Sequence, residues 1–328
     1  MSSLRALKRR ITTVKNTSQV TKAMQMISAS KMRTAVHYAT QTVPYTKAMS
    51  EIISKMGDIS DYQSELTSKP EVVKNILIVI IGQSRGFVGG LVTLLASHVA
   101  KNCKEIRDEY PDATISALTI HRKALNIAQL AGLQSKYHFA KYFDKPSTTV
   151  LSPIYTTILN AYKSHEYDEI YISYVHFINT MVQKPFFTKL LPIDLDYIAE
   201  QISTKGKVGT AKKEYANIHT DTHKSNDNLE KNENTEKIDN NDLVFEPSKK
   251  SILDFVLPEF FESEILTAVL DSNASEESAR MVAMKNATEN AKELSKTLTL
   301  QYNQSRQAKI TSEILEVASG SVMINAEQ

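Results

Sequence analysis

Hydrophobic residues at both ends of the chain recur at the spacing of a coiled coil. Near the start, the repeat consists of Leu4, Leu7, Ile11 and Val14. These positions are separated by three, four and three residues, which is the spacing of an interhelical seam. The apolar positions that continue the repeat less strictly are Val20, Met24 and Ile27. The pattern predicts a long amino-terminal helix that packs along one narrow stripe.

The other end of the chain carries two narrow apolar stripes. One seam contains Ala287, Ala291, Leu294 and Leu298, and a second, displaced stripe contains Leu300, Ile310, Ile314, Val317 and Ile324. Small and polar residues dominate between them. Because a lone polar helix is marginal in water, we expect the two ends to pair as an antiparallel coiled coil. The alternative is an ordinary helical bundle, whose helices are shorter and bury a wider apolar face.

Glycine and proline are unevenly distributed, which supports long helices at both ends. The first 56 residues contain no Gly and one Pro, Pro44, and residues 259–319 contain neither. Such a stretch could reach roughly 90 Å as an unbroken helix. The sequence LDSNASEE (270–277) is rich in capping residues, which allows a kink or break near Asn273 and a new helix start near Ser275.

The middle of the chain alternates between strand and helix patterns. Strands are predicted at 75–82, 113–121, 168–177 and 185–193, and helices at 90–110, 122–132 and 148–167. This alternation predicts a central Rossmann-like α/β domain with a largely parallel sheet. The fold class is therefore α/β plus a long coiled coil.

Residues 203–242 differ in composition from the rest of the chain. They contain seven Lys, eight acidic residues and seven Asn, and they lack the apolar surface needed to offset the entropy of ordering. We predict a disordered polar insertion. The expected organisation is an amino-terminal coiled-coil helix, the α/β domain, the insertion, a return segment with the helix start, and a carboxy-terminal coiled-coil helix. Their bounds are 1–57, 70–202, 203–242, 243–270 and 271–328.

Composition narrows the class of protein. The 328-residue chain is 41% hydrophobic and 23% charged, with a formal net charge of +2, which is typical of a globular protein and does not indicate nucleic-acid binding. The single cysteine, Cys103, excludes an internal disulfide framework and a cysteine zinc site. The longest strongly apolar run, Ile76 to Ile81, is far shorter than the roughly 20 residues of a membrane span. Any link to a membrane must therefore go through partners.

No catalytic, metal or cofactor site emerges from the motifs. The loop GQSRGFVGG (82–90) lies where nucleotide-binding loops lie, but Ser84 and Phe87 stand at the third and sixth positions, where the dinucleotide fingerprint requires Gly. We interpret the loop as a structural turn. The pair His219 and His223 lacks a carboxylate shell. The remaining candidates, which we interpret as structural, are His121, His176 and Cys103.

The distribution of charge near the start of the chain indicates function more clearly than any motif does. Residues 1–50 contain no acidic residue and nine basic ones: Arg5, Lys8, Arg9, Arg10, Lys15, Lys22, Lys31, Arg33 and Lys47. A mitochondrial transit peptide shares this composition, but the helical pattern outlasts a transit peptide and has a partner at the far end. Nucleic-acid binding would require a compact recognition module. A basic helix pair that faces acidic protein loops is the remaining interpretation.

These segments closely resemble a known family. Residues 4–35 and 275–321 resemble the two ends of the gamma subunit of F-type ATP synthases. Residues 246–261 resemble the family's segment before the last helix, and QSRGFVGG (83–90) resembles its SDRGLCGG loop. The resemblance covers nearly the whole chain except 203–242.

The resemblance implies a left-handed antiparallel coiled coil that acts as the central rotor shaft. The shaft turns inside a ring of three alpha and three beta subunits, and the α/β domain, with the epsilon subunit, rests on the membrane c-ring. Ion flow turns that ring, and the asymmetric shaft changes the nucleotide affinities of the beta subunits. The resemblance implies no catalytic residue, cofactor or metal in this chain, no nucleic acid, and a location on the cytoplasmic face of the bacterial inner membrane.

The family's contacts between shaft and ring carry over by position. They correspond to Arg9, Arg10, Lys22, Met24, Arg280, Arg306, Gln307 and Thr311. The sequence departs from the family at Ser84, where the loop has Asp, and at Phe87 and Val88, where it has Leu and Cys. The insertion 203–242 has no cysteine, which excludes a thiol switch there. The alternatives are a non-rotary coiled-coil adaptor with an α/β head and an enzyme with a degenerate dinucleotide site.

Overall fold

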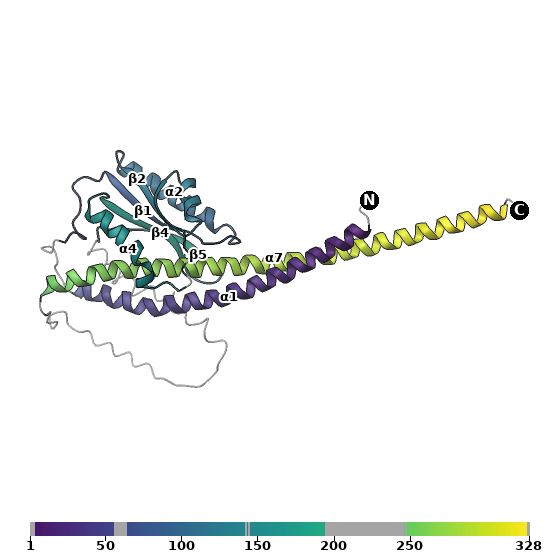
Figure 1. Cartoon of the computed structure of the whole chain (residues 1–328), viewed down its shortest axis with the longest axis horizontal. Helices are drawn as coiled ribbons and strands as arrows, with labels where there is room; N and C mark the ends of the chain where they lie inside the picture. The colour runs from purple at the N-terminus through teal and green to yellow at the C-terminus, as the bar shows by residue number, and fades with distance from the viewer. Residues whose placement is uncertain are drawn as a thin grey trace, which may run out of the picture. The chain divides into compact units, whose positions relative to one another are not determined.

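The computed structural model describes residues 4–55, 64–141, 143, 145–193, 246 and 248–326. The predicted insertion 203–242 lies outside the described residues, as do His219 and His223. The elements in chain order are α1 (Leu4–Lys55), β1 (Asn75–Ile81), α2 (Leu91–Glu109), β2 (Thr114–Ile120), α3 (Ala124–Leu130), β3 (Gln134–Phe139), α4 (Thr148–Lys163), β4 (Glu169–Phe177), β5 (Gln183–Leu191) and α7 (Lys249–Ala326) (Figure 1).

The contacts divide the chain into two units. The first, which we call the shaft unit, contains the start of α1 up to Ala29 and the part of α7 from Arg280 onward. The second, which we call the α/β unit, contains residues 30–279 and therefore the whole sheet. The five segments proposed from the sequence remain a prediction.

The α/β unit is built on a five-stranded sheet in the order β3-β2-β1-β4-β5. The first four strands are mutually parallel, and β5 pairs with β4 in the antiparallel direction. The central strand β1 is buried from Ile76 to Ile81, as expected of a strand covered on both faces. This confirms the predicted Rossmann-like layer and its largely parallel pairing.

Alternate residues of β1 belong to two different hydrophobic clusters, because successive side chains point to opposite faces of a sheet. Ile76, Ile78 and Ile80 pack with α2 and α3. Leu77, Val79 and Ile81 pack with α4 and with the parts of α1 and α7 that belong to this unit. The long helices and α4 therefore together form one of the two covering layers that an α/β sheet requires.

The sequence patterns missed one strand. β3, with the sequence QSKYHF, lies at the edge of the sheet, and its residues alternate between exposed and half-buried. None of its side chains is fully buried, so it lacks the continuous apolar run that identified β1. The other predicted strands and helices of the middle region are confirmed.

α7 is one helix of 78 residues, so the break near Asn273 and the new helix start near Ser275 that the capping residues allowed do not occur. The capping-type side chains there bond to the α/β unit instead of to the ends of a helix. The amide of Asn273 donates to the carbonyl of Phe143 at 3.0 Å, and the Asp271 carboxylate is 2.5 Å from Nδ1 of His176. Burial raises the pKa of the Asp271 carboxyl, and the hydrogen bond and charge of His176 oppose this shift.

Gly82, at the end of β1, permits a close approach of strand and helix. A Cβ atom at this position would lie 2.6 Å from the backbone nitrogen of Ala124. Gly82→Ala should therefore destabilise the full-length chain by about 1–3 kcal/mol, because the backbone must shift to relieve the overlap. The midpoint of chemical denaturation measures the effect.

Gly86→Ala in the same loop is the matched control, since a Cβ there meets nothing within 4 Å. Its midpoint should stay near that of the wild type. Equal midpoints for Gly82→Ala and the wild type would show that the tight packing at Ala124 is not required.

Candidate functional site

The candidate functional site of the shaft unit is the surface of the paired helices, since the pocket found among its described residues is shallow and open. The two helices run antiparallel, with the start of α1 alongside the later part of α7 (Figure 1). The hydroxyls of Thr21 and Thr288 form a hydrogen bond across the pair at 2.8 Å. Thr288 also donates to the carbonyl of Met284 at 2.7 Å. The interface is therefore polar at its middle.

The buried and half-buried positions define the actual seam. In α1 the repeat runs through Leu4, Leu7, Ile11, Val14, Ser18, Thr21, Gln25 and Ser28, and Met24 beside it is also half-buried. In α7 they include Met284, Thr288, Ala291, Ser295, Leu298 and Tyr302. Both series follow the three-and-four repeat of a coiled coil. Most of the side chains beyond Val14 are small or polar, which allows close approach but little apolar burial.

Three apolar positions that the sequence assigned to the seams lie outside them. Val20 is 59% exposed, Ile27 is 58% exposed and Leu294 is 43% exposed. Ser18, Thr21 and Ser295 take the seam positions instead. The prediction failed there because it followed hydrophobicity, whereas the repeat continues through hydroxyl side chains. Val20, Ile27 and Leu294 therefore belong to the outer surface.

α7 is longer than its partner helix at the free end. Counting seventeen residues from the Thr21–Thr288 pair reaches Leu4 in α1 and Ser305 in α7. α7 continues to Ala326, which adds roughly 30 Å of helix at 1.5 Å per residue. Residues 303–318 are all exposed. We call the stretch from Ser305 onward the unpaired tip.

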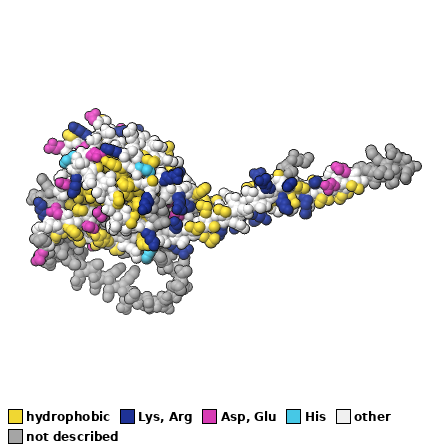
Figure 2. Space-filling view, in the orientation of Figure 1, with side chains coloured by type: hydrophobic (Ala, Val, Ile, Leu, Met, Phe, Trp, Pro, Cys, Tyr) yellow, Lys and Arg dark blue, Asp and Glu magenta, His cyan; other side chains and the backbone are white. Residues whose placement is uncertain are grey.

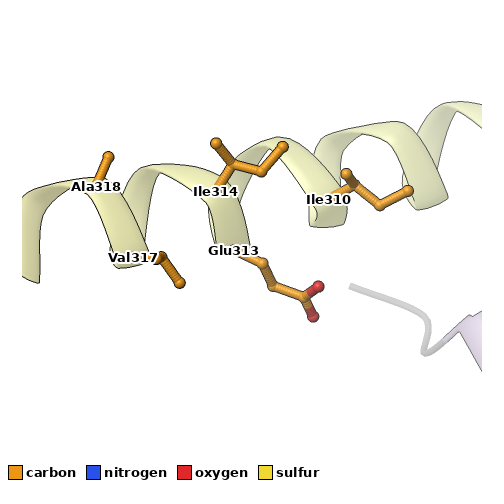
Figure 3. A pocket seen from close by; sticks show the side chains of 5 residues that line it. All are labelled: Ile310, Glu313, Ile314, Val317 and Ala318. Carbon is orange, nitrogen blue, oxygen red and sulfur yellow. The ribbon is translucent and has the colours of Figure 1, made fainter. Parts of the chain in front are cut away.

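The unpaired tip carries the second apolar stripe that the sequence predicted. Ile310, Ile314 and Val317 are exposed, and Val317 is 74% exposed. Together with Glu313 and Ala318 they line a shallow pocket of about 410 Å³ (Figure 3). All five side chains come from one helix, and a single helix surface cannot enclose a small ligand. The stripe is therefore an open surface of one helix and not a ligand-binding cleft. The side chain of Ile324 lies outside the described residues.

Basic residues cover the paired part of α1. Arg5, Lys8, Arg9, Arg10, Lys15 and Lys22 are all exposed. Figure 2 shows such dark-blue side chains on the helix pair. None of these six forms an ion pair with a residue that the structure describes, so their charge is available to an acidic partner.

The residues that the resemblance pointed to do not gather in one place. Arg9, Arg10 and Lys22 are exposed on α1, and Met24 is half-buried beside the seam. Arg306, Gln307 and Thr311 are exposed on the unpaired tip, where the Thr311 hydroxyl donates to the carbonyl of Gln307 at 3.0 Å. Arg280 is the exception, because only 5% of its surface is exposed. The set is distributed along the two helices.

The loop after β1 is occupied by a side chain of the same chain. Both backbone N–H groups of Ser84 and Arg85 donate to the Glu276 carboxylate, at 2.8 and 3.1 Å. The Ser84 hydroxyl donates to the same carboxylate at 2.7 Å. A nucleotide phosphate would need these donors. With Glu276 in this position, these N–H groups are already used within the chain.

The remaining titratable candidates have structural surroundings. His121 is buried, and its Nδ1 lies 3.0 Å from the carbonyl oxygen of Gly82. Cys103 is buried in α2, and burial raises the pKa of its thiol to about 11. Among the described residues, no group of three or more His, Cys, Asp or Glu side chains could hold a metal ion. No described helix has the length and apolar character to cross a membrane.

The comparisons with known proteins agree on one family. The family model described as ATP synthase matches residues 3–322. The ATP synthase gamma chain of Chloroflexus aurantiacus is 34% identical over 329 residues, covering 99% of this chain and all of that protein. That of Akkermansia muciniphila is 36% identical over 320 residues, covering 97% and 98%.

Solved structures show the same fold at lower identity. A chain of the Euglena gracilis mitochondrial ATP synthase rotor is similar with a TM-score of 0.57 and 19% identity, covering 94% of this chain and 98% of that one. A chain of the Tetrahymena thermophila mitochondrial ATP synthase central stalk and c-ring is similar with a TM-score of 0.54 and 17% identity, covering 82% and 99%.

Burial predicts that the single cysteine is chemically protected. At pH 8 a thiol of pKa about 11 is almost entirely protonated, and the thiolate is the reactive form. In the native chain, Cys103 should react with an aromatic disulfide reagent at least ~100-fold more slowly than an exposed cysteine, since each pKa unit is a factor of ten. Absorbance of the released thiolate measures the rate.

The reference is Ser305→Cys in a Cys103→Ala background, which places the only thiol on the unpaired tip. Denaturation should remove the difference between the two proteins. Similar native rates would contradict the burial of Cys103 in α2.

Proposed function

The chain belongs to the family of ATP synthase gamma chains, and from this premise we propose how its helix pair performs the work of a shaft. The chain is the central rotor shaft of an ATP synthase, coupling the ion-driven rotation of a membrane c-ring to the conformational cycle of the catalytic subunits. The structural observation that best supports this mechanism is that α7 extends as an exposed tip beyond the basic helix pair.

The partners follow from the family. The chain is a subunit of a membrane-bound complex, and the similar structures come from assemblies named as rotor, F1 and c-ring. We assign the helix pair to the alpha and beta subunits and the α/β unit to the c-ring and the epsilon subunit. The complex then lies on the cytoplasmic face of the bacterial inner membrane, with this chain bound to the membrane only through the c-ring.

The chain itself makes and breaks no bond in this proposal. The occupation of the loop after β1 by Glu276 supports it, because the donors that could hold a phosphate are already used. His176 is paired with Asp271, and Cys103 is buried. Catalysis is assigned to the beta subunits, and the chain changes their nucleotide affinities by turning.

A polar surface on the helix pair suits a shaft that must rotate against its partner subunits. Burying about 40 Å² of apolar surface is worth roughly 1 kcal/mol. An apolar stripe facing separate apolar patches would therefore create deep wells at particular angles. Exposed Ser, Thr, Gln and basic side chains can exchange one partner contact for another during rotation at a low cost in free energy. Within this surface we assign partner contacts to Arg9, Arg10, Lys22, Met24, Arg306, Gln307 and Thr311. Arg280, although matched to a family contact, offers a partner little surface because it is buried.

The apolar stripe of the unpaired tip requires a different partner surface. Ile310, Ile314 and Val317 are exposed, and apolar contacts have no preferred direction. A socket with a continuous apolar lining would bury the same area at every angle and leave the rotational energy nearly flat. We assign the stripe to such a socket at the end of the catalytic ring.

The stoichiometry of the intact complex tests the rotor against a non-rotary adaptor, an alternative that finds no support among the similar proteins. We expect one copy of the chain to co-purify from membranes with three alpha and three beta subunits. Native mass spectrometry of the complex gives the count. Two or more copies per ring would contradict a central shaft.

Leucine in place of three exposed polar residues of the unpaired tip should impede rotation. In the triple variant Ser305→Leu, Gln307→Leu, Thr311→Leu, each new side chain adds about 1–2 kcal/mol of angle-dependent contact. The ATPase rate of the complex should fall by roughly tenfold or more, because each 1.4 kcal/mol added to the barrier is a factor of ten. The assay is steady-state ATP hydrolysis by the purified complex.

The matched control places leucine at Thr149, Ser152 and Thr156, three exposed positions of α4. It adds the same kind of surface away from the helix pair and should leave hydrolysis near the wild-type rate. If the tip variant rotates and hydrolyses ATP like the wild type, low adhesion is not what the polar surface provides.

A further inference from the structure

A segment of α7 inside the α/β unit is buried on all sides although it is mainly polar. Every residue from Ala268 to Ser278 is buried. The polar members are Asp271, Ser272, Asn273, Ser275, Glu276, Glu277 and Ser278. A helix that is buried all round is normally hydrophobic all round. We call residues 271–278 the polar belt, and its polarity needs a reason.

The belt bonds to the carboxyl ends of the strands. Beyond the bonds of Asp271 and Asn273 described above, the Ser275 hydroxyl donates to the carbonyl of Val175 in β4 at 3.0 Å. The Ser278 hydroxyl donates to the carbonyl of Thr180, in the β4–β5 turn, at 2.8 Å. Glu276 accepts from the loop after β1. Open α/β sheets bind their ligands at this edge, so here a helix of the same chain occupies the ligand's position.

Directional bonds restrict turning in a way that apolar contacts do not. A helix seated only by apolar side chains can shift about its axis and exchange one contact for another. A hydrogen bond weakens steeply when its distance or angle changes. The belt bonds to three separate segments around α7, so a rotation of the helix within the sheet would strain several bonds at once.

Glu276 connects the belt to the loop after β1. Its carboxylate accepts three hydrogen bonds between 2.7 and 3.1 Å, and only 1% of the residue is exposed. Bonds to an ionised group are roughly twice as strong as neutral ones, and burial strengthens them further. Ser84 contributes a hydroxyl, which can donate its proton to the carboxylate.

We propose that Glu276 is a positioning residue that fixes the rotational position of α7 in the α/β unit, so that load applied to this unit turns the helix. The inference rests on the proposed rotor function and deepens it. Two stretches of the same continuous helix then differ in function. The exposed tip has no preferred rotational angle relative to its partners, and the buried polar belt keeps the helix at one rotational angle relative to the α/β unit.

The test is Glu276→Gln in the intact complex purified from membranes and in energised membrane vesicles. Gln keeps the shape but presents an N–H₂ group to one of the loop N–H donors, so the loop connection weakens. We expect ATP hydrolysis without load to stay within about twofold of wild type. ATP synthesis, which loads the connection, should fall about tenfold, so the ratio of synthesis to hydrolysis falls as well. Hydrogen exchange at the amides of Ser84 and Arg85 should accelerate about tenfold.

Two further variants make the result specific. Ser84→Ala removes only the hydroxyl bond and should lower the same ratio by a smaller factor; it also carries the test if Glu276→Gln fails to assemble. Glu105→Gln, an exposed position of α2, should leave the ratio unchanged. A purely structural role of Glu276 would lower the amount of assembled complex and both rates together, with an unchanged ratio.

The proposal is overturned if amide exchange in the loop accelerates while the ratio of synthesis to hydrolysis stays at the wild-type value. It is equally overturned if the exchange rates do not change, because Glu276 would then not hold the loop. Failure of the rotor function itself has a different signature: complexes lacking the whole chain would still couple ion flow to ATP synthesis.

Discussion

The antiparallel pairing of α1 and α7 is the interaction on which the function of this chain depends. Each helix is too polar to be stable alone in water, so each exists because it packs on the other. The seam achieves this with small and hydroxyl side chains, including the hydrogen-bonded pair Thr21 and Thr288. A wide apolar interface would have stabilised the pair more strongly, but it would also have placed more apolar residues near the surface that must move past its partners.

The same helix α7 is held in two different ways along its length. Inside the α/β unit its segment from Ala268 to Ser278 is buried and bonded through directional contacts such as those of Glu276 and Ser275. In the shaft unit its outer surface is exposed, and from Asn303 to Ala318 every residue is exposed. A rotor helix that receives torque in the α/β unit and transmits it to the catalytic subunits must be fixed in the first place and free to change contacts in the second. Polar side chains usually lie at the surface of a protein. In α7 many of them are buried instead, in the segment that is fixed to the α/β unit.

The sequence predicted the architecture well because the relevant signals are long and local. The repeat Leu4 to Val14, the strand Asn75–Ile81 and the absence of Gly and Pro from 259–319 each identified an element that the structure contains. The signals failed where tertiary contacts decide. Asn273 and Ser275 have the chemistry of helix caps, and only the sheet around them shows that they bond elsewhere. Val20 and Leu294 have the chemistry of a seam, yet hydroxyl residues occupy it.

The functional surface was less accessible to sequence reasoning than the fold. Arg306, Gln307 and Thr311 came from resemblance, and their contacts with a catalytic ring remain a prediction. Periodicity could not find Glu276, because a single acidic residue in a polar helix looks like solvated surface. Its role becomes visible only when the loop after β1 is folded against it. The measurement that tests the account most directly is single-molecule rotation. The complex is immobilised through its catalytic ring, and a bead is attached to the α/β unit through Lys101→Cys on α2. On addition of ATP the account predicts unidirectional rotation of the bead with three equivalent pauses per turn. A bead that stays at one angle while the same molecules hydrolyse ATP would contradict it.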